Sequence, residues 1–167
     1  MRNAKNVICF LSVGLLCAVV IYPFLHELGH SLAAVAFGGE VVQISWLPLP
    51  AVLCRLHTHD ALQYVTVGLS GIVFPALLCL FVRSNRFWVW YAIFIIRLIC
   101  AWSLLLAGLS LLLFRSGRGL PYDDMTAILE KTPAQSGLYG LLIAALLFAV
   151  CLAVSRSHPI RRIVAFL

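Results

Sequence analysis

The stretch NVICFLSVGLLCAVVIYPFLHELGHSLAAVAFGG, residues 6–39, has no acidic, basic or histidine side chain before His26. A membrane-spanning helix needs roughly 20 mostly apolar residues, and the segment that precedes His26 supplies them. The apolar pattern then continues to Gly38, so the predicted helix has about 30 residues and a length of roughly 45 Å. Because Pro23 lacks an amide hydrogen, we expect a kink just before His26.

The rest of the chain shares this apolar character. Of its 167 residues, 63% are hydrophobic and 11% are charged, against roughly 45–50% and 25% in soluble domains. We predict an all-α membrane protein of about four transmembrane helices, multi-pass in the cell membrane and forming a single integral-membrane domain over residues 1–167. No small-x-small cleavage site follows the first apolar run, so we expect a retained helix there. The predicted spans are residues 7–37, 61–82, 87–114 and 135–155.

A different pattern separates the first two spans. In residues 41–56, Val42, Ile44 and Trp46 alternate with polar residues, and two prolines follow. A period of two around a proline-containing centre is typical of a short β-hairpin whose prolines lie at a turn or edge.

The net charge of +6 raises the question of nucleic-acid binding, which we do not expect. The basic residues occur in ones and twos at the ends of apolar segments, where they hold membrane helices in place. With four spans, seven of them share the side of the two termini: Arg2, Lys5, Arg83, Arg86, Arg156, Arg161 and Arg162. The positive-inside rule then predicts cytoplasmic termini.

The motif His26-Glu27-Leu28-Gly29-His30 carries the chemistry. In a helix, residues four apart lie on one face, so His26 and His30 can bind one cation while Glu27 points beside it. This H-E-x-x-H geometry is typical of zinc hydrolases, in which the Glu is a general base. A catalytic zinc normally takes three protein ligands and a water, so a third ligand must come from elsewhere.

Few other side chains can supply that third ligand. Asp124, our preferred candidate, lies with Asp123 where a polar loop meets a predicted short helix, and the glycines of that loop let it bend inward. Asp123 is the alternative ligand or a helix cap, and capping alone also explains an Asp here. The remaining candidates are His57, His59, Asp60 and Glu130.

Two further features of the later spans bear on the site. Gly68 and Gly71 make close helix approach possible in the second span. Arg97 lies inside the third apolar segment, where it can pair with Asp123, Asp124 or another carboxylate, or support a developing oxyanion. Alternatively, Arg97 extends its guanidinium to the membrane interface.

The HELGH helix, with its small-residue continuation and Gly-Gly end, resembles the site-2 protease family of intramembrane zinc metallopeptidases, most closely its small members. In that family a β-hairpin, a glycine-rich span and a zinc-binding Asp follow the motif helix. This chain has the same order in residues 41–56, GLSG at 68–71, and Asp124. LPYDD at 120–124 replaces the Asn-x-x-Pro and Leu-Asp-Gly motif of the larger members.

The resemblance implies a zinc metalloendopeptidase that cleaves peptide bonds in or near the membrane-spanning segments of a substrate protein within the lipid bilayer. Zn²⁺ would be held by His26, His30 and Asp124, with Glu27 as the catalytic residue. The alternatives are a catalytically silent membrane scaffold or chaperone of the same fold, and a small metal carrier. The intact Glu27 favours the hydrolase, because a purely binding site needs no general base. A carrier is less expected, because carriers usually contain internal repeats and none is recognisable in this sequence.

Overall fold

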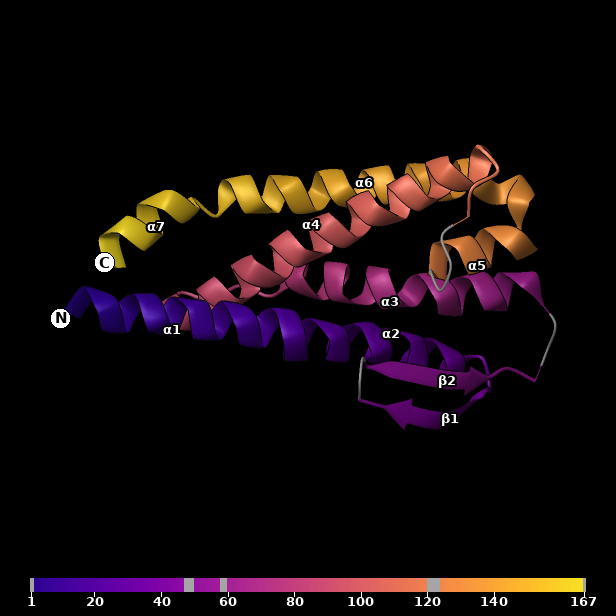
Figure 1. Ribbon diagram of the computed structural model, residues 1–167, viewed down its shortest axis with the longest axis horizontal. Helices are drawn as coiled ribbons and strands as arrows, with labels where there is room; N and C mark the ends of the chain where they lie inside the picture. The colour runs from indigo at the N-terminus through magenta and orange to yellow at the C-terminus, as the bar shows by residue number, and fades with distance from the viewer. Residues whose placement is uncertain (1, 47–49, 58–59, 120–123, 167) are drawn as a thin grey trace.

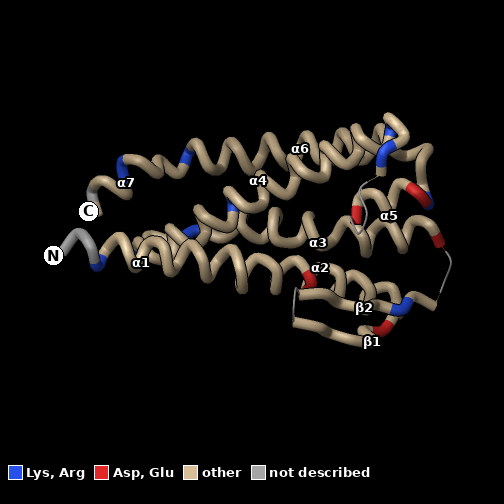
Figure 2. The backbone as a smooth tube through the Cα atoms, in the orientation of Figure 1, with Lys and Arg blue, Asp and Glu red and all other residues tan. Residues whose placement is uncertain are grey.

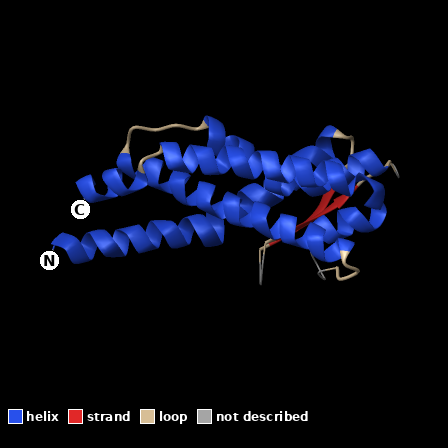
Figure 3. Cartoon of the chain, turned by 90° about the horizontal axis from the view of Figure 1, so that it is seen from above, coloured by secondary structure: helices blue, strands red, loops and turns tan. Residues whose placement is uncertain are grey.

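The computed structural model describes residues 2–46, 50–57, 60–119 and 124–166. Four of its helical segments are long and apolar enough to cross a membrane, namely Lys5–Ala36, Ala61–Phe81, Phe87–Arg115 and Pro133–Val164. They confirm the predicted fold class and the order of the predicted spans. Figures 1 and 3 show an elongated helical bundle with both chain ends at one end and the hairpin towards the other.

The first span is helical throughout but changes its geometry before the HELGH motif. It consists of α1 (Arg2–Leu16), a π-helical segment (Cys17–Ile21) and α2 (Tyr22–Ala36). Pro23 lies in the first turn of α2. The π-helical segment, a feature that often accompanies helix kinks, ends two residues before Pro23 and so precedes the position just before His26 at which the kink was predicted.

The predicted hairpin is present and packs on α2. Strands β1 (Glu40–Ser45) and β2 (Ala51–Arg55) pair antiparallel, with Glu40 opposite Arg55 and an irregular register between Val41 and Gln43. An ion pair of 2.8 Å joins the side chains of Glu40 and Arg55. Both strands contact α2, so the hairpin lies beside the motif helix (Figure 1).

The second and third spans are α3 (Ala61–Phe81) and α4 (Phe87–Arg115). Asp60 caps α3, because its side chain accepts a hydrogen bond of 2.9 Å from the Leu62 amide. At the other end of α3, the carbonyl oxygen of Cys79 accepts a hydrogen bond of 3.0 Å from Nε of Arg97.

The chain then folds back through short helices. Helix α5 (Asp124–Lys131) buries Met125, Ile128 and Leu129 in the core and contacts α3 and α4. A 3₁₀ turn (Pro133–Gln135) leads into α6 (Ser136–Arg156), which packs along α4. The basic tail forms an eight-residue helix, α7 (Pro159–Phe166), which the sequence did not predict.

Charge is distributed unevenly along this bundle. The carboxylates of the described residues lie in the half that contains the hairpin and α5, whereas the half with the two termini carries basic residues alone (Figure 2). Large apolar side chains face outward on the long helices, including Leu11, Leu112, Leu141 and Phe148. An apolar exterior of this kind suits contact with lipid.

Candidate metal centre

The two histidines of the motif meet on one face of α2. Their Nε2 atoms lie 3.2 Å apart, and the rings are nearly perpendicular, at 83°. This is the consequence of the i, i+4 spacing on a regular helix. The side chain of His30 is 12% exposed and that of His26 is 21% exposed, so both nitrogens are partly shielded from solvent.

Asp124 completes the group from a distant part of the chain. Its Oδ2 atom lies 3.2 Å from Nε2 of His26 and 3.4 Å from Nε2 of His30. Asp124 is the first residue of α5, and α5 approaches α3 closely because Gly68 leaves room for Ile128. A Cβ at Gly68 would lie 2.8 Å from the side chain of Ile128.

The orientation of His30 is set by the backbone of α3. Its Nδ1 lies 2.7 Å from the carbonyl oxygen of Val67. Because a carbonyl oxygen only accepts, Nδ1 carries the hydrogen and Nε2 of the neutral ring is left with a lone pair. Such an outer hydrogen bond is typical of metal-binding histidines.

The resulting set of donors fits a cation. Nε2 of His30 faces Nε2 of His26 and the Asp124 carboxylate, and the three donor atoms lie within 4.8 Å of one another. Lone pairs that converge in this way repel unless a proton or a metal lies between them. Two imidazoles and one carboxylate, with one position left for water, form a donor set that zinc takes in catalytic sites.

The Asp124 carboxylate is suited to remain ionised. Burial by itself raises the pKa of this carboxyl, but the His26 and His30 rings outweigh that effect when they carry a proton that they share with the carboxylate. They hold the pKa of Asp124 well below its usual range. The side chain is 47% exposed, so the group opens to solvent on the side of α5.

Two glycines allow the helices to approach closely enough to build the site. A Cβ at Gly71 would collide with Nε2 of His30 and would lie 2.8 Å from Cε1 of His26. A Cβ at Gly29, inside the motif, would lie 2.9 Å from the carbonyl carbon of Ser70. Glycine at both positions therefore lets α2 and α3 pack with their backbones close together.

Glu27 follows His26 on α2, the helix on which the hairpin packs. Its side chain is half-buried, and its charge acts on the thiol of Cys54 in β2. Burial and, to a smaller extent, the Glu27 carboxylate raise the pKa of this thiol.

The remaining sequence candidates do not join this group. Asp123 and His59 lie outside the described residues. His57 and Glu130 are exposed, and Asp60 caps α3. Within the described chain, the one cluster of potential metal ligands is His26, His30 and Asp124.

The suggested pairing of Arg97 with Asp124 is wrong. The ion-pair partners of Asp124 are the two histidines, while Arg97 donates to backbone carbonyls of Cys79 and Val82, at 3.0 and 3.4 Å. Cys79 is eight residues beyond Gly71, the position on α3 that meets the donor rings, which is roughly 12 Å of helix. Arg97 therefore stabilises the end of α3 at a distance from the donor group, too far to support an oxyanion there.

Comparison with known proteins does not add to these observations. No family model, no curated protein and no solved structure matches the chain.

Proposed function

We propose that this protein is a zinc-dependent endopeptidase that hydrolyses peptide bonds in or near the membrane-spanning segments of other proteins. The observation that carries the proposal is the convergence of His26, His30 and Asp124 within 4.8 Å, with a carboxylate at the next position of the same helix. This constellation joins two ligands, a third ligand and a general base, which are the parts that metal-assisted hydrolysis requires.

Each residue has a defined part in this proposal. His26, His30 and Asp124 would hold the zinc ion. When bound, zinc polarises the carbonyl of the scissile bond and lowers the pKa of water. Glu27 accepts the proton of the attacking water and passes it to the leaving amine, as general acid–base catalysis requires. The hydrogen bond from His30 to Val67 keeps Nε2 free for the metal.

The surroundings of the donor group favour a membrane-protein substrate. The group is flanked by α2 and α3, both parts of helices able to cross a membrane, and solvent can reach it beside the exposed Asp124. Hydrolysis needs an unwound substrate, which can add as a strand to the edge of a sheet. The hairpin, which packs on the motif helix, is suited to hold it. The resemblance of the HELGH segment to site-2 proteases supports the same conclusion.

Reconstitution into liposomes with a single-span model substrate tests the proposal. We expect cleavage to stop when a chelator removes the metal and to return when zinc is added back. His30→Ala should abolish both zinc binding and cleavage, whereas the control His57→Ala, on an exposed loop residue, should retain both. Cleavage that continues after measured loss of zinc would contradict the proposal.

A further inference from the structure

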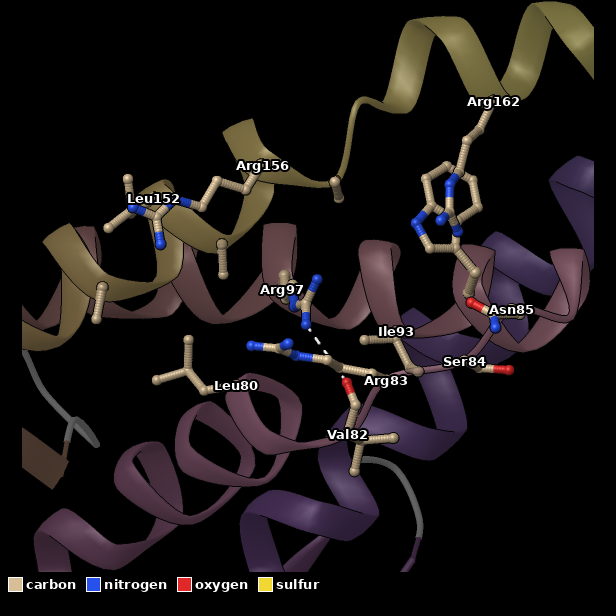
Figure 4. A pocket seen from close by; sticks show the side chains of 14 residues that line it. Leu80, Val82, Arg83, Ser84, Asn85, Ile93, Arg97, Leu152, Arg156 and Arg162 are labelled. Atoms are coloured by element: carbon tan, nitrogen blue, oxygen red, sulfur yellow. Dashed lines mark hydrogen bonds between the residues drawn. The ribbon is translucent and has the colours of Figure 1, made fainter.

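A cavity lies at the basic end of the bundle, lined by the end of α3, the loop that follows it, α4, α6 and α7. It has a volume of about 550 Å³. Four arginines line it, namely Arg83, Arg97, Arg156 and Arg162. Figure 4 shows that they come from four different segments of the chain, with the side chains of Arg83 and Arg97 near the carbonyl of Val82.

Among the residues that the structure describes, no carboxylate lines the cavity beside these arginines. None of its lining residues is acidic, and the sequence has no Asp or Glu in residues 61–122 or 131–167, which include every element that lines it. Arg97 is 8% exposed and partly compensated by the carbonyls at the end of α3. Arg83, Arg156 and Arg162 form no ion pair with a described carboxylate, so an anion that enters the cavity gains charge-assisted hydrogen bonds.

The positive-inside rule accounts for arginines at this end of the bundle but not for which of them line the cavity. Arg86, in the same loop as Arg83, and Arg161, next to Arg162 on α7, do not line the cavity. Arg162 is further held over the ring of Trp90, at 5.2 Å from its centroid. The arginines that line the cavity are therefore a subset of the basic residues at this end of the bundle.

The rest of the lining indicates an amphipathic ligand. Ser84 and Asn85 add neutral hydrogen-bonding groups, whereas Leu80 and Leu152 add apolar ones. Figure 4 shows Leu80 and Leu152 at the opposite side of the cavity from Ser84 and Asn85. The volume exceeds what an inorganic anion needs and suits a headgroup with its attached glycerol.

The position of the cavity also matches the membrane surface. Helix α7 carries two arginines, and its apolar Ile160 and Val164 are 79% and 68% exposed. Basic, amphipathic helices of this kind lie in the lipid interface. Basic pockets between membrane helices at the cytoplasmic side are typical of sites for anionic lipid headgroups.

We propose that this cavity binds the phosphate headgroup of an anionic membrane phospholipid. Arg83, Arg156 and Arg162 supply positive charge around the headgroup, and Leu80 and Leu152 pack against the glycerol and the first methylenes of the acyl chains. The site is separate from the metal centre, and the proposal does not depend on the proposed protease activity.

Two double variants with the same loss of charge test the proposal on the purified full chain. Arg83→Gln/Arg162→Gln removes two cavity arginines, and the control Arg86→Gln/Arg161→Gln removes their neighbours from the same segments. Binding of phosphatidylglycerol is measured by native mass spectrometry and by thermal stabilisation in neutral detergent. Phosphatidylcholine and inorganic phosphate serve as comparison ligands.

We expect the wild type and the control to bind phosphatidylglycerol equally, and at least about tenfold more tightly than phosphatidylcholine. The cavity variant should bind phosphatidylglycerol at least about tenfold more weakly. Ala149→Phe fills part of the cavity without removing a charge and should weaken binding in the same way. This variant covers the case in which the double variant does not fold.

Three results would overturn the proposal. An equal loss of affinity for phosphatidylglycerol in the cavity variant and in the control would mean that the lipid is attracted to the basic surface as a whole. Equal binding of the two phospholipids would remove the requirement for an anionic headgroup. The site would be assigned to a free anion if inorganic phosphate displaced phosphatidylglycerol and stabilised the protein to the same extent.

Discussion

The Nδ1 atom of His30 lies 2.7 Å from the carbonyl oxygen of Val67. This contact joins the motif helix to the second span and leaves Nε2 of His30 directed towards His26 and Asp124. The geometry of the donor group therefore depends on how α2 packs on α3 as well as on the HELGH sequence. Substitutions that separate the two helices should impair the site without removing any ligand.

Gly71→Ala tests that dependence. The new Cβ would collide with His30 and approach His26 to 2.8 Å, so the rings must move away from their common point. We expect zinc content, measured on the purified protein by mass spectrometry, to fall at least about tenfold, since outer-shell disruption typically has that effect. Gly108→Ala in α4, where the new Cβ meets Ile143 at an ordinary 3.8 Å, is the matched control and should bind zinc normally.

The position of Glu27 beside the hairpin predicts an effect on Cys54. Burial and the Glu27 carboxylate raise the pKa of this thiol, so Glu27→Gln should lower it and increase the thiolate fraction. We expect faster alkylation of Cys54 at mildly alkaline pH, measured by mass spectrometry of its peptide. Glu130→Gln in α5 should leave the rate unchanged; equal rates in all three proteins would show that Glu27 faces away from β2.

Arg97 should be a structural residue. It is 8% exposed and donates to the carbonyls of Cys79 and Val82, and a hydrogen bond to a charged group contributes about 1.5–3 kcal/mol. Arg97→Leu should therefore lower the free energy of unfolding by about 2 kcal/mol, measured by detergent-induced denaturation. Zinc content per folded protein should not change. A loss of zinc at full stability would instead connect Arg97 to the donor group.

The hairpin should act as a substrate edge through β1. Ile44 is 55% exposed and pairs with Val52, so a charge there leaves the fold intact but is unfavourable for an apolar substrate strand. Ile44→Lys should reduce cleavage of a model substrate by about tenfold, with zinc content unchanged. Leu53→Lys on β2, 58% exposed, is the control; a similar loss there, or none in either variant, would remove the edge role of β1.

The long helices were predictable because charge is so scarce. The predicted spans 61–82 and 87–114 end within one residue of α3 (Ala61–Phe81) and α4 (Phe87–Arg115). Helix α7 was not predicted, because an eight-residue segment with two arginines contains too little periodicity to distinguish it from a basic tail. The π-helical segment (Cys17–Ile21) has a sequence signal only in the proline that follows it.

The candidate site could be predicted in part. The spacing of the motif on one helix predicts that His26, Glu27 and His30 belong to one site. Asp124 was preferred as the third ligand because a bent loop could bring it inward. The role of the Val67 carbonyl could not be predicted, because a backbone atom becomes a partner only through helix packing. Gly29 offered a signal inside the motif itself, as a small residue at a helix contact.

The central claim is that Glu27 acts as the general base beside a bound zinc ion. The most direct test measures zinc content and cleavage of a single-span model substrate together, in the wild type, in Glu27→Gln and in the control Glu130→Gln. We predict that all three proteins bind zinc, that Glu130→Gln cleaves as the wild type does, and that Glu27→Gln loses cleavage by at least about a hundredfold. Cleavage by zinc-loaded Glu27→Gln at the wild-type rate would contradict the account.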